Sequence, residues 1–231
     1  MQRPMQEFKV DEYLSDKEQA ERIKQWWLEN YKAIFAGIVI ALLIIGGWRY
    51  WQHRVQTRAA AASALYNKLS DAVKANNGPD ALKLTNSLMN EYSDTPYAAQ
   101  GALVMGGYDV DNGKSDDAVK MLTWATAHSK DQSLALLARL RLARVQLANG
   151  DGKAAIKTLT VENTGGFTPL YDDVRGDAYA KLGDTDKARK AYKQALAKWD
   201  DKMGDKSLIQ MKLNNLAATP AAKPTKGDSA K

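Results

Sequence analysis

AYAKLGDTDKARKAYKQALAKW, at residues 178–199, is the stretch that decides the fold. Apolar residues recur with helical spacing on both sides of Gly183, and Asp184 follows the glycine directly. Glycine is favoured just after the end of a helix, and aspartate is favoured as the cap that starts one. The stretch therefore predicts two helices joined by a tight turn.

The same pattern occurs three times, centred on Gly113, Gly150 and Gly183 at separations of 37 and 33 residues. A small residue precedes each glycine by seven positions, an alanine follows by five, and a large residue comes four positions later. The small residues are Gly106, Ala143 and Gly176, the alanines Ala118, Ala155 and Ala188, and the large residues Leu122, Leu159 and Tyr192. A further alanine follows as Ala125 and Ala195, whereas the middle copy has Glu162.

This spacing indicates that two antiparallel helices cross closely at the small residues, while the large residue fills the space between repeats. Residues 178–199 closely resemble a tetratricopeptide repeat (TPR), and residues 142–159 are a fair copy. The first copy departs from the pattern at Asp109, where a large apolar residue is usual, and the last has Arg175 in place of leucine. Stacked hairpins of this kind close a continuous core and leave a concave groove lined by the first helices.

Further helices are predicted on both sides of these copies. Residues 59–75 and 80–92 form another predicted pair, interrupted by the turn-forming sequence NNGP. Residues 207–216 are a predicted capping helix, and residues 217–231 are predicted to be a disordered tail. We expect an all-α fold: one N-terminal transmembrane helix followed, over residues 52–216, by a TPR-like α-solenoid of about three to four helical hairpins.

The membrane segment is the uncharged run AIFAGIVIALLIIGGW at residues 33–48. Lys32 and Arg49 flank it, and aromatic residues gather at both ends: Trp26, Trp27, Tyr31, Trp48, Tyr50 and Trp51. Aromatic belts and snorkelling basic residues are typical of a membrane-spanning helix, so a span over residues 33–51 is predicted. A buried core helix needs no such belts. A cleaved signal peptide would begin with a short basic stretch, so we expect an uncleaved anchor.

Residues 1–32 are expected to form an N-terminal segment with an interfacial helix. Ser15 and Glu18 form a capping-box pattern at the start of this helix. Within the span, Ala33, Gly37 and Ala41 recur every four residues and could let another transmembrane helix approach closely. Ordinary use of small residues explains this stripe as well. Four basic residues near each end of the span leave the orientation undecided.

Composition limits the chemistry that the chain can carry. The sequence has no cysteine, and its net charge of +6 comes from interspersed residues without a basic run, which argues against nucleic-acid binding. The run DVDNGKSDD at residues 109–117 is a poor calcium loop, because its glycine comes one place early and Lys120 replaces the closing glutamate. His53 and His128 have no ligand-like neighbours in the sequence. We expect no catalytic, cofactor-binding or metal site.

Arginine residues cluster on the first helix of the middle copy. Arg139, Arg141 and Arg144 lie close in sequence, and Arg141 and Arg144 are the candidates for a partner-binding groove that clamps acidic peptide or carboxylate groups. The alternative is a solvated or internally paired helix face.

Five stretches in their order resemble the YfgM family of bacterial inner-membrane proteins. They are ERIKQWWLENYKAIFAG, GWRYWQHR, RLRLARVQLANGD, DVRGDAYAKLGD and MKLNNL, within residues 15–216. The resemblance implies a cytoplasmic N-terminus, a periplasmic TPR-like domain and a role as a non-enzymatic ancillary subunit of the Sec translocon, SecYEG. It also implies the periplasmic chaperone PpiD as a partner, with secreted chains as clients. Two alternatives stay open at this point: a membrane-anchored TPR regulator or assembly factor facing the cytoplasm, and an enzyme with an unrecognised site.

Overall fold

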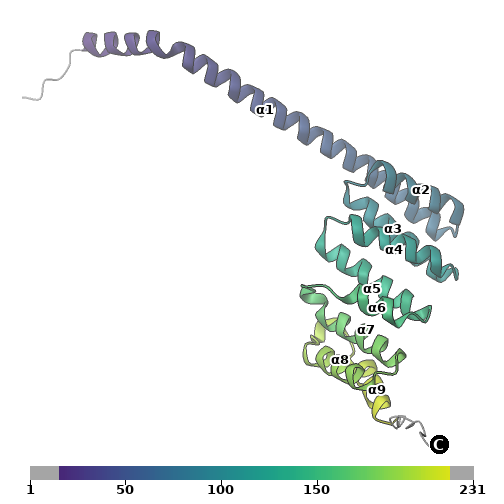
Figure 1. Cartoon of the computed structure of the whole chain (residues 1–231). Coiled ribbons are helices and arrows are strands. Elements are labelled where there is room, and N and C mark those ends of the chain that lie inside the picture. Colours follow the sequence, from purple (N-terminus) through teal and green to yellow (C-terminus); the bar gives the residue numbers. More distant parts are fainter. Residues whose placement is uncertain (1–15, 219–231) are drawn as a thin grey trace, which may run out of the picture. The chain divides into compact units, whose positions relative to one another are not determined.

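Every regular element in the described part of the chain is helical. The structure is a computed structural model that describes residues 16–218, and the chain divides into two compact units, residues 1–56 and 57–231 (Figure 1). The helices are α1 (Asp16–Lys74), α2 (Gly78–Glu91), α3 (Pro96–Asp111), α4 (Ser115–His128), α5 (Gln132–Ala148), α6 (Gly152–Leu159), α7 (Thr168–Lys181), α8 (Thr185–Ala197) and α9 (Ser207–Ala218), with short 3₁₀ turns η1 (Gly165–Phe167) and η2 (Asp201–Met203). The predicted all-α class is confirmed.

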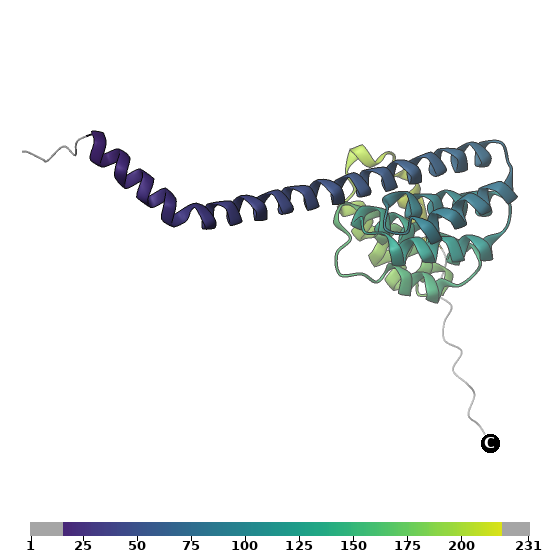
Figure 2. The same ribbon diagram turned by 90° about the horizontal axis from the view of Figure 1, so that it is seen from above.

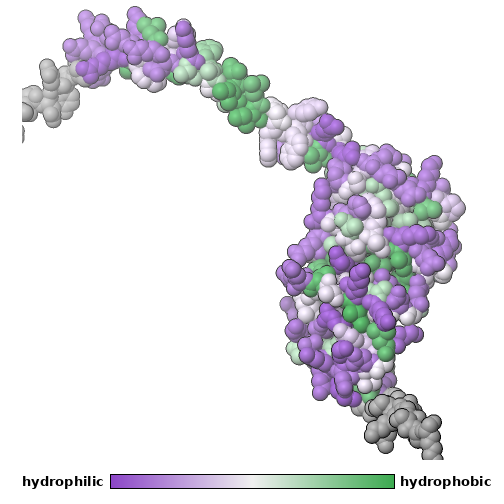
Figure 3. Space-filling model, viewed as in Figure 1, coloured by the Kyte–Doolittle hydropathy of each residue, from purple (hydrophilic) through white to green (hydrophobic). Residues whose placement is uncertain are grey.

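The first unit consists of the N-terminal part of α1. Within residues 16–218, α1 is the one helix long and apolar enough to cross a membrane, and its most apolar window has no buried residue. Its large apolar side chains, from Ile23 to Trp51, are exposed. Figure 3 shows a green patch in the middle of this part of the helix, with a mostly purple stretch before it. The predicted span over residues 33–51 lies in this helix. The predicted cap at Ser15 lies outside the described residues, as do residues 219–231 of the predicted tail. Residues 217 and 218, also predicted as tail, are the last residues of α9.

The second unit is a stack of four helical hairpins. The C-terminal part of α1 pairs with α2, and α3 with α4, α5 with α6 and α7 with α8 follow, while α9 packs on the last hairpin. Figure 1 shows them one below another in chain order, and Figure 2 looks along the stack. Four clusters of buried apolar side chains lie along the stack: three join neighbouring hairpins, and the fourth joins the last hairpin to α9. This arrangement matches the expected TPR-like solenoid.

Each hairpin turn depends on one residue with positive φ. Gly113, Gly150 and Gly183 have φ of 71°, 87° and 79°, a conformation that costs glycine nothing. The amide that follows each of them donates to the carbonyl five positions earlier, at 2.7 to 3.0 Å, and satisfies the end of the first helix. Asn76, 37 residues before Gly113, has φ of 54° and the same hydrogen bond, so the predicted pair at residues 59–92 is a fourth copy of the repeat.

The two helices of a hairpin approach most closely where the small residues lie. A Cβ atom added to Gly106 would lie 2.9 Å from Leu122 Cγ, and one added to Gly176 would lie 2.4 Å from Tyr192 Cε1. Ala143 is fully buried at the equivalent place in the third hairpin, and Ala118, Ala155 and Ala188 are fully buried on the second helices. Large side chains on the second helices therefore fill space that the small residues leave on the first.

The middle copy differs from the others because its second helix is short. Helix α6 ends at Leu159, so Glu162 lies beyond the helix and never takes the position that Ala125 and Ala195 occupy in their hairpins. Arg175, the other departure on α7, forms an ion pair with Asp172 and donates to the carbonyl of Leu159 at 3.3 Å. Both departures from the repeat pattern thus have local structural reasons.

Replacing Gly176 by alanine is expected to destabilise the fold by about 1–3 kcal/mol, because the new methyl group collides with the Tyr192 ring. Gly107→Ala is the matched control, since a Cβ there meets nothing within 4 Å and alanine is favoured in a helix interior. Denaturant unfolding followed by circular dichroism measures both. Equal stability of the two variants would show that the close crossing at Gly176 is not a constraint.

Candidate protein-docking groove

A shallow cavity opens between the first helices of the second and third hairpins. Its volume is about 210 Å³, and its lining comes from α3, α4 and α5: Gly106, Gly107, Val110, Asp111, Leu122, Arg141, Arg144 and Val145. Because α3 and α5 are first helices, this cavity belongs to the concave face. Val110 is 43% exposed and gives the rim an apolar patch between charged groups. The cavity can hold a side chain or a short extended segment of another protein.

Arg141 and Arg144 lie three residues apart on α5 and therefore share a helix face. Between them, Leu142 and Ala143 are buried in the stack, and this burial turns the two arginines outward. Both are exposed, and among residues 16–218 neither forms a hydrogen bond or ion pair. Arg139, the third arginine of the cluster, is half-buried and does not line the cavity. The predicted pair is therefore available to acidic groups in the groove.

A partly buried polar cluster joins α9 to α7 and α8. Lys212 Nζ of α9 donates to Asp173 Oδ1 at 2.9 Å and to Asp177 at 2.8 Å, and the Tyr192 hydroxyl donates to Asp177 Oδ1 at 2.7 Å. The Lys212 ammonium also lies 5.8 Å from the centre of the Tyr192 ring. The cluster thus fastens the terminal helix to the last hairpin.

Burial and charge act against each other in this cluster. Burial raises the pKa of Asp173, and the hydrogen bond from Lys212 opposes the rise only in part. Burial also acts to lower the pKa of Lys212, but the bonds to two carboxylates outweigh it and raise the pKa. Tyr192 has a raised pKa because its ring is buried and its hydroxyl donates to Asp177. The hydroxyl therefore stays protonated and remains a donor.

The cluster determines which charges of the concave face stay open. The positive charge of Arg144 slightly opposes the rise in the pKa of Asp173. The ion pairs of Asp173 and Asp177, however, are with Lys212. Helix α9 therefore pairs with Asp173 and Asp177 of α7, while Asp172 of the same helix pairs with Arg175. The arginines of α5 are left without a salt-bridge partner in the described residues.

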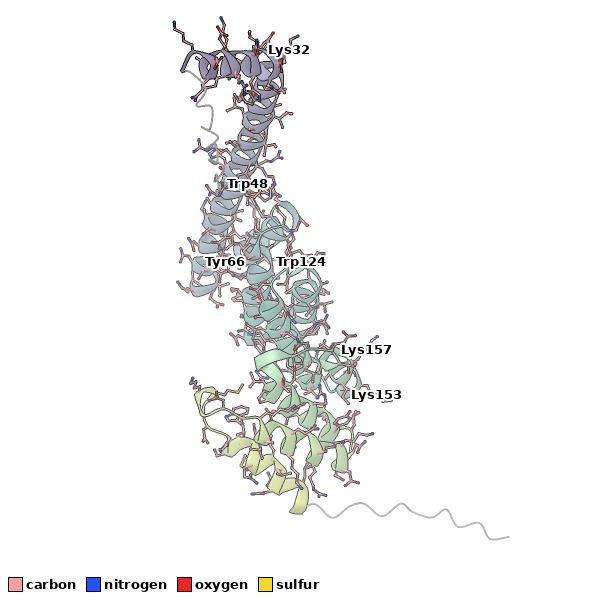
Figure 4. The ribbon with its side chains drawn as sticks, turned by 90° about the vertical axis from the view of Figure 1, so that its left-hand side faces the viewer. Lys32, Trp48, Tyr66, Trp124, Lys153 and Lys157 are labelled. Atoms are coloured by element: carbon pink, nitrogen blue, oxygen red, sulfur yellow. The ribbon has the colours of Figure 1, made fainter. Side chains whose placement is uncertain are left out.

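Figure 4 places basic side chains elsewhere on the same hairpin. Lys153 and Lys157 on α6 point away from the stack, on the helix opposite the arginines, and both are exposed. Trp124, also labelled, is partly buried, and its ring stacks on His128 at 4.3 Å. Among residues 16–218 no three His, Cys, Asp or Glu side chains are placed to hold a metal ion.

The other predicted docking feature lies on α1. Ala33, Gly37 and Ala41 are exposed there, and a Cβ atom on Gly37 would meet nothing within 4 Å. The stripe is therefore open to another helix, but its role as a docking face stays a prediction.

Sequence reasoning missed the α7–α9 cluster, although the four-residue spacing of Asp173 and Asp177 indicates a common helix face.

An exposed apolar helix, long enough to cross a membrane, followed by four stacked hairpins defines a TPR-like repeat protein with a candidate membrane anchor. Residues 24–218 match the family described as tetratricopeptide repeat-like domain. No solved structure matches the chain.

Comparison with individual proteins identifies the family within the TPR-like class. The chain is 32% identical over 205 residues to the ancillary SecYEG translocon subunit of Escherichia coli K12, and the match covers 89% of this chain and 98% of the relative. Proteins of the same name match at 31% in Aggregatibacter actinomycetemcomitans and at 28% in Neisseria gonorrhoeae, each over 88% of this chain and 98% of the relative. The chain belongs to the family of ancillary SecYEG translocon subunits, as the resemblance to the YfgM family predicts.

Lys212→Met is expected to loosen α9 and to cost about 1–3 kcal/mol, because Asp173 is left buried without its cation. Hydrogen exchange of the peptide covering α9 should accelerate, whereas exchange in α3 and α4 should not. Lys193→Met is the control, since Lys193 is exposed on α8 and has no ion pair among the described residues. Unchanged exchange of α9 in Lys212→Met would show that the cluster does not hold α9 on the last hairpin.

Proposed function

We propose that the protein is a non-enzymatic scaffold at the Sec translocon, with its repeat unit as the docking surface. The observation that carries this proposal is the match along nearly the whole chain to ancillary SecYEG translocon subunits. The exposed apolar part of α1 supports it, because an anchor would keep the repeats beside a membrane channel at high effective concentration. The open groove between α3 and α5 supports it further, since concave TPR-like surfaces bind peptide segments.

The proposed topology is the one that the resemblance to the YfgM family implies. Residues 1–32 would lie in the cytoplasm, residues 33–51 in the inner membrane and residues 52–216 in the periplasm. The basic residues flanking the span do not choose a direction, so the proposed orientation is supported by the resemblance to the YfgM family alone. In this topology the groove faces the compartment that secreted chains enter.

The proposed partners are SecYEG, the periplasmic chaperone PpiD and secreted or outer-membrane client chains. The names of the relatives support SecYEG as a partner. The resemblance to the YfgM family supports PpiD and the client chains. The unpaired guanidinium groups of Arg141 and Arg144 favour a segment that brings carboxylates to the groove. Val110 would contact an apolar side chain of the same segment.

A double variant, Arg141→Ala with Arg144→Ala, tests the groove. A photoreactive residue at Val110, in full-length protein in living cells, should crosslink to a translocon subunit or PpiD, and the double variant should lower the yield about tenfold, the equivalent of about 1.4 kcal/mol. Lys153→Ala with Lys157→Ala is the matched control, because it removes the same charge from the opposite helix of one hairpin. Equal crosslinking by both double variants would exclude the arginine pair as the docking site.

The absence of cysteine from the sequence allows a direct test of orientation. Lys153→Cys places one thiol on the exposed face of α6, and Lys24→Cys places one on the other side of the predicted span. A membrane-impermeant maleimide should label Lys153→Cys in cells with a permeabilised outer membrane, but should label Lys24→Cys only after lysis. The reverse pattern would place the repeats in the cytoplasm and favour the regulator that the sequence left open.

A further inference from the structure

The carboxyl group of Asp109, near the end of α3, has no hydrogen-bond or ion-pair partner in the described part of the chain. Its residue is 1% exposed, neither oxygen forms a hydrogen bond or ion pair, and Oδ2 is the one fully buried side-chain polar atom without a partner among residues 16–218. Burial raises the pKa of Asp109, and the nearby charge of Asp117 adds to this more than Lys114 opposes it. Buried carboxylates are normally paired, so this one calls for an explanation.

The equivalent positions in the next two hairpins do have partners. Gln146 and Tyr179 stand four residues before their turn glycines, as Asp109 stands before Gly113. The Gln146 amide oxygen accepts a hydrogen bond from Thr158 at 2.8 Å, and the Lys187 ammonium lies 5.6 Å from the centre of the Tyr179 ring. Both partners come from the second helix of the same hairpin.

The second hairpin lacks both of these partners. Met121 stands where Thr158 stands in the third hairpin and cannot donate a hydrogen bond, and Asp117 stands where Lys187 stands in the fourth and carries the opposite charge. Asp117 is itself bonded to Lys120 at 2.8 Å. The hairpin therefore supplies no donor to Asp109, and one from outside would complete the site.

A cavity of about 330 Å³ leads to this carboxyl group. It lies between the second helices α2 and α4, with α3 as its floor, and is thus separate from the groove between α3 and α5. Its walls are apolar at Pro79, Leu82, Met105 and Met121, and Lys114 and Asp117 are its other charged residues. This combination suits a side chain with an aliphatic stem and a cationic end.

We propose that this outer-face cavity receives one lysine or arginine side chain of a partner protein, with the charged end on Asp109 and the stem between Met105 and Met121. The site goes beyond the groove function, since it takes the opposite charge on another face and does not require Arg141 or Arg144. A divalent cation is a poor occupant, because one free carboxylate offers too few oxygen ligands. Lys114 lines the cavity but forms no ion pair with Asp109, so the structure leaves the carboxyl group open to a partner.

The test uses the full-length protein in detergent micelles with ¹³C-labelled methionine methyl groups. The chain has seven methionines, and Met105→Leu and Met121→Leu assign the two that line the cavity. Titration with n-butylguanidinium should shift both signals and reach saturation, whereas the neutral isostere n-butylurea should bind at least about tenfold more weakly. Asp109→Asn should abolish this preference and should raise the melting temperature of the free protein, because an unpaired buried carboxylate is removed.

Three results would overturn the proposal. Equal shifts with the guanidinium and urea probes would mean that the cavity takes any apolar molecule of this size. Saturable guanidinium binding that appears only in Lys114→Gln would mean that this lysine fills the cavity from within the chain. No binding in either protein would mean that Asp109 is a neutral buried acid. None of these results bears on the Arg141 and Arg144 crosslinking test, so the two proposals can fail separately.

Discussion

The close crossing of two helices inside each hairpin is the constraint on which the rest of the repeat unit depends. At Gly176 the Tyr192 ring occupies the space that a side chain would need, and at Gly106 the Leu122 side chain does so. Each crossing fixes the distance between the two helices and thereby presents one apolar face to the next hairpin. Since a single hairpin cannot bury that face, the stack follows from the crossing.

The polar groups of the stack are arranged around this apolar framework. At the C-terminal end, Lys212 binds Asp173 and Asp177, two of the three carboxylates of α7, and lets α9 cover the last hairpin, which is the usual task of a terminal repeat element. Within residues 16–218, no ion pair of this kind involves Arg141 or Arg144 of α5. The concave face therefore changes along the stack from a closed, internally paired part to an open, basic part, although it is built from one repeated unit.

The sequence predicts the framework well because its main requirements are local. Each turn and each helix crossing can be recognised within one hairpin. The signals are a glycine with positive φ, an alanine five positions later and a large residue beyond it. The first hairpin is harder to recognise in the sequence, because Asn76 replaces the glycine and Thr85 takes the place of the large residue. The Thr85 hydroxyl donates to the carbonyl of Ala81. Asparagine tolerates this backbone conformation, so the turn survives without the expected residue.

The polar sites were harder to predict because they join residues far apart in the sequence. The contact from Lys212 to Asp173 spans 39 positions and depends on where α9 packs. Asp109 was visible as a departure from the repeat, but its isolation depends on the absence of a donor at Met121, which only the packing of α4 on α3 reveals. Patterns within one helix thus indicated which residues were unusual, while the structure was needed to show what each one faces.

The short helix α6 limits how cooperatively the two ends of the stack unfold. In a linear array, each unit is coupled only to its neighbours, so cooperativity between the two ends is limited by the weakest unit. Helix α6 has eight residues, against 13 or 14 in α2, α4 and α8, and it is followed by a loop and a 3₁₀ turn before α7 begins. The third hairpin is therefore where the array would divide first, into an N-terminal part joined to the anchor helix and a C-terminal part closed by α9.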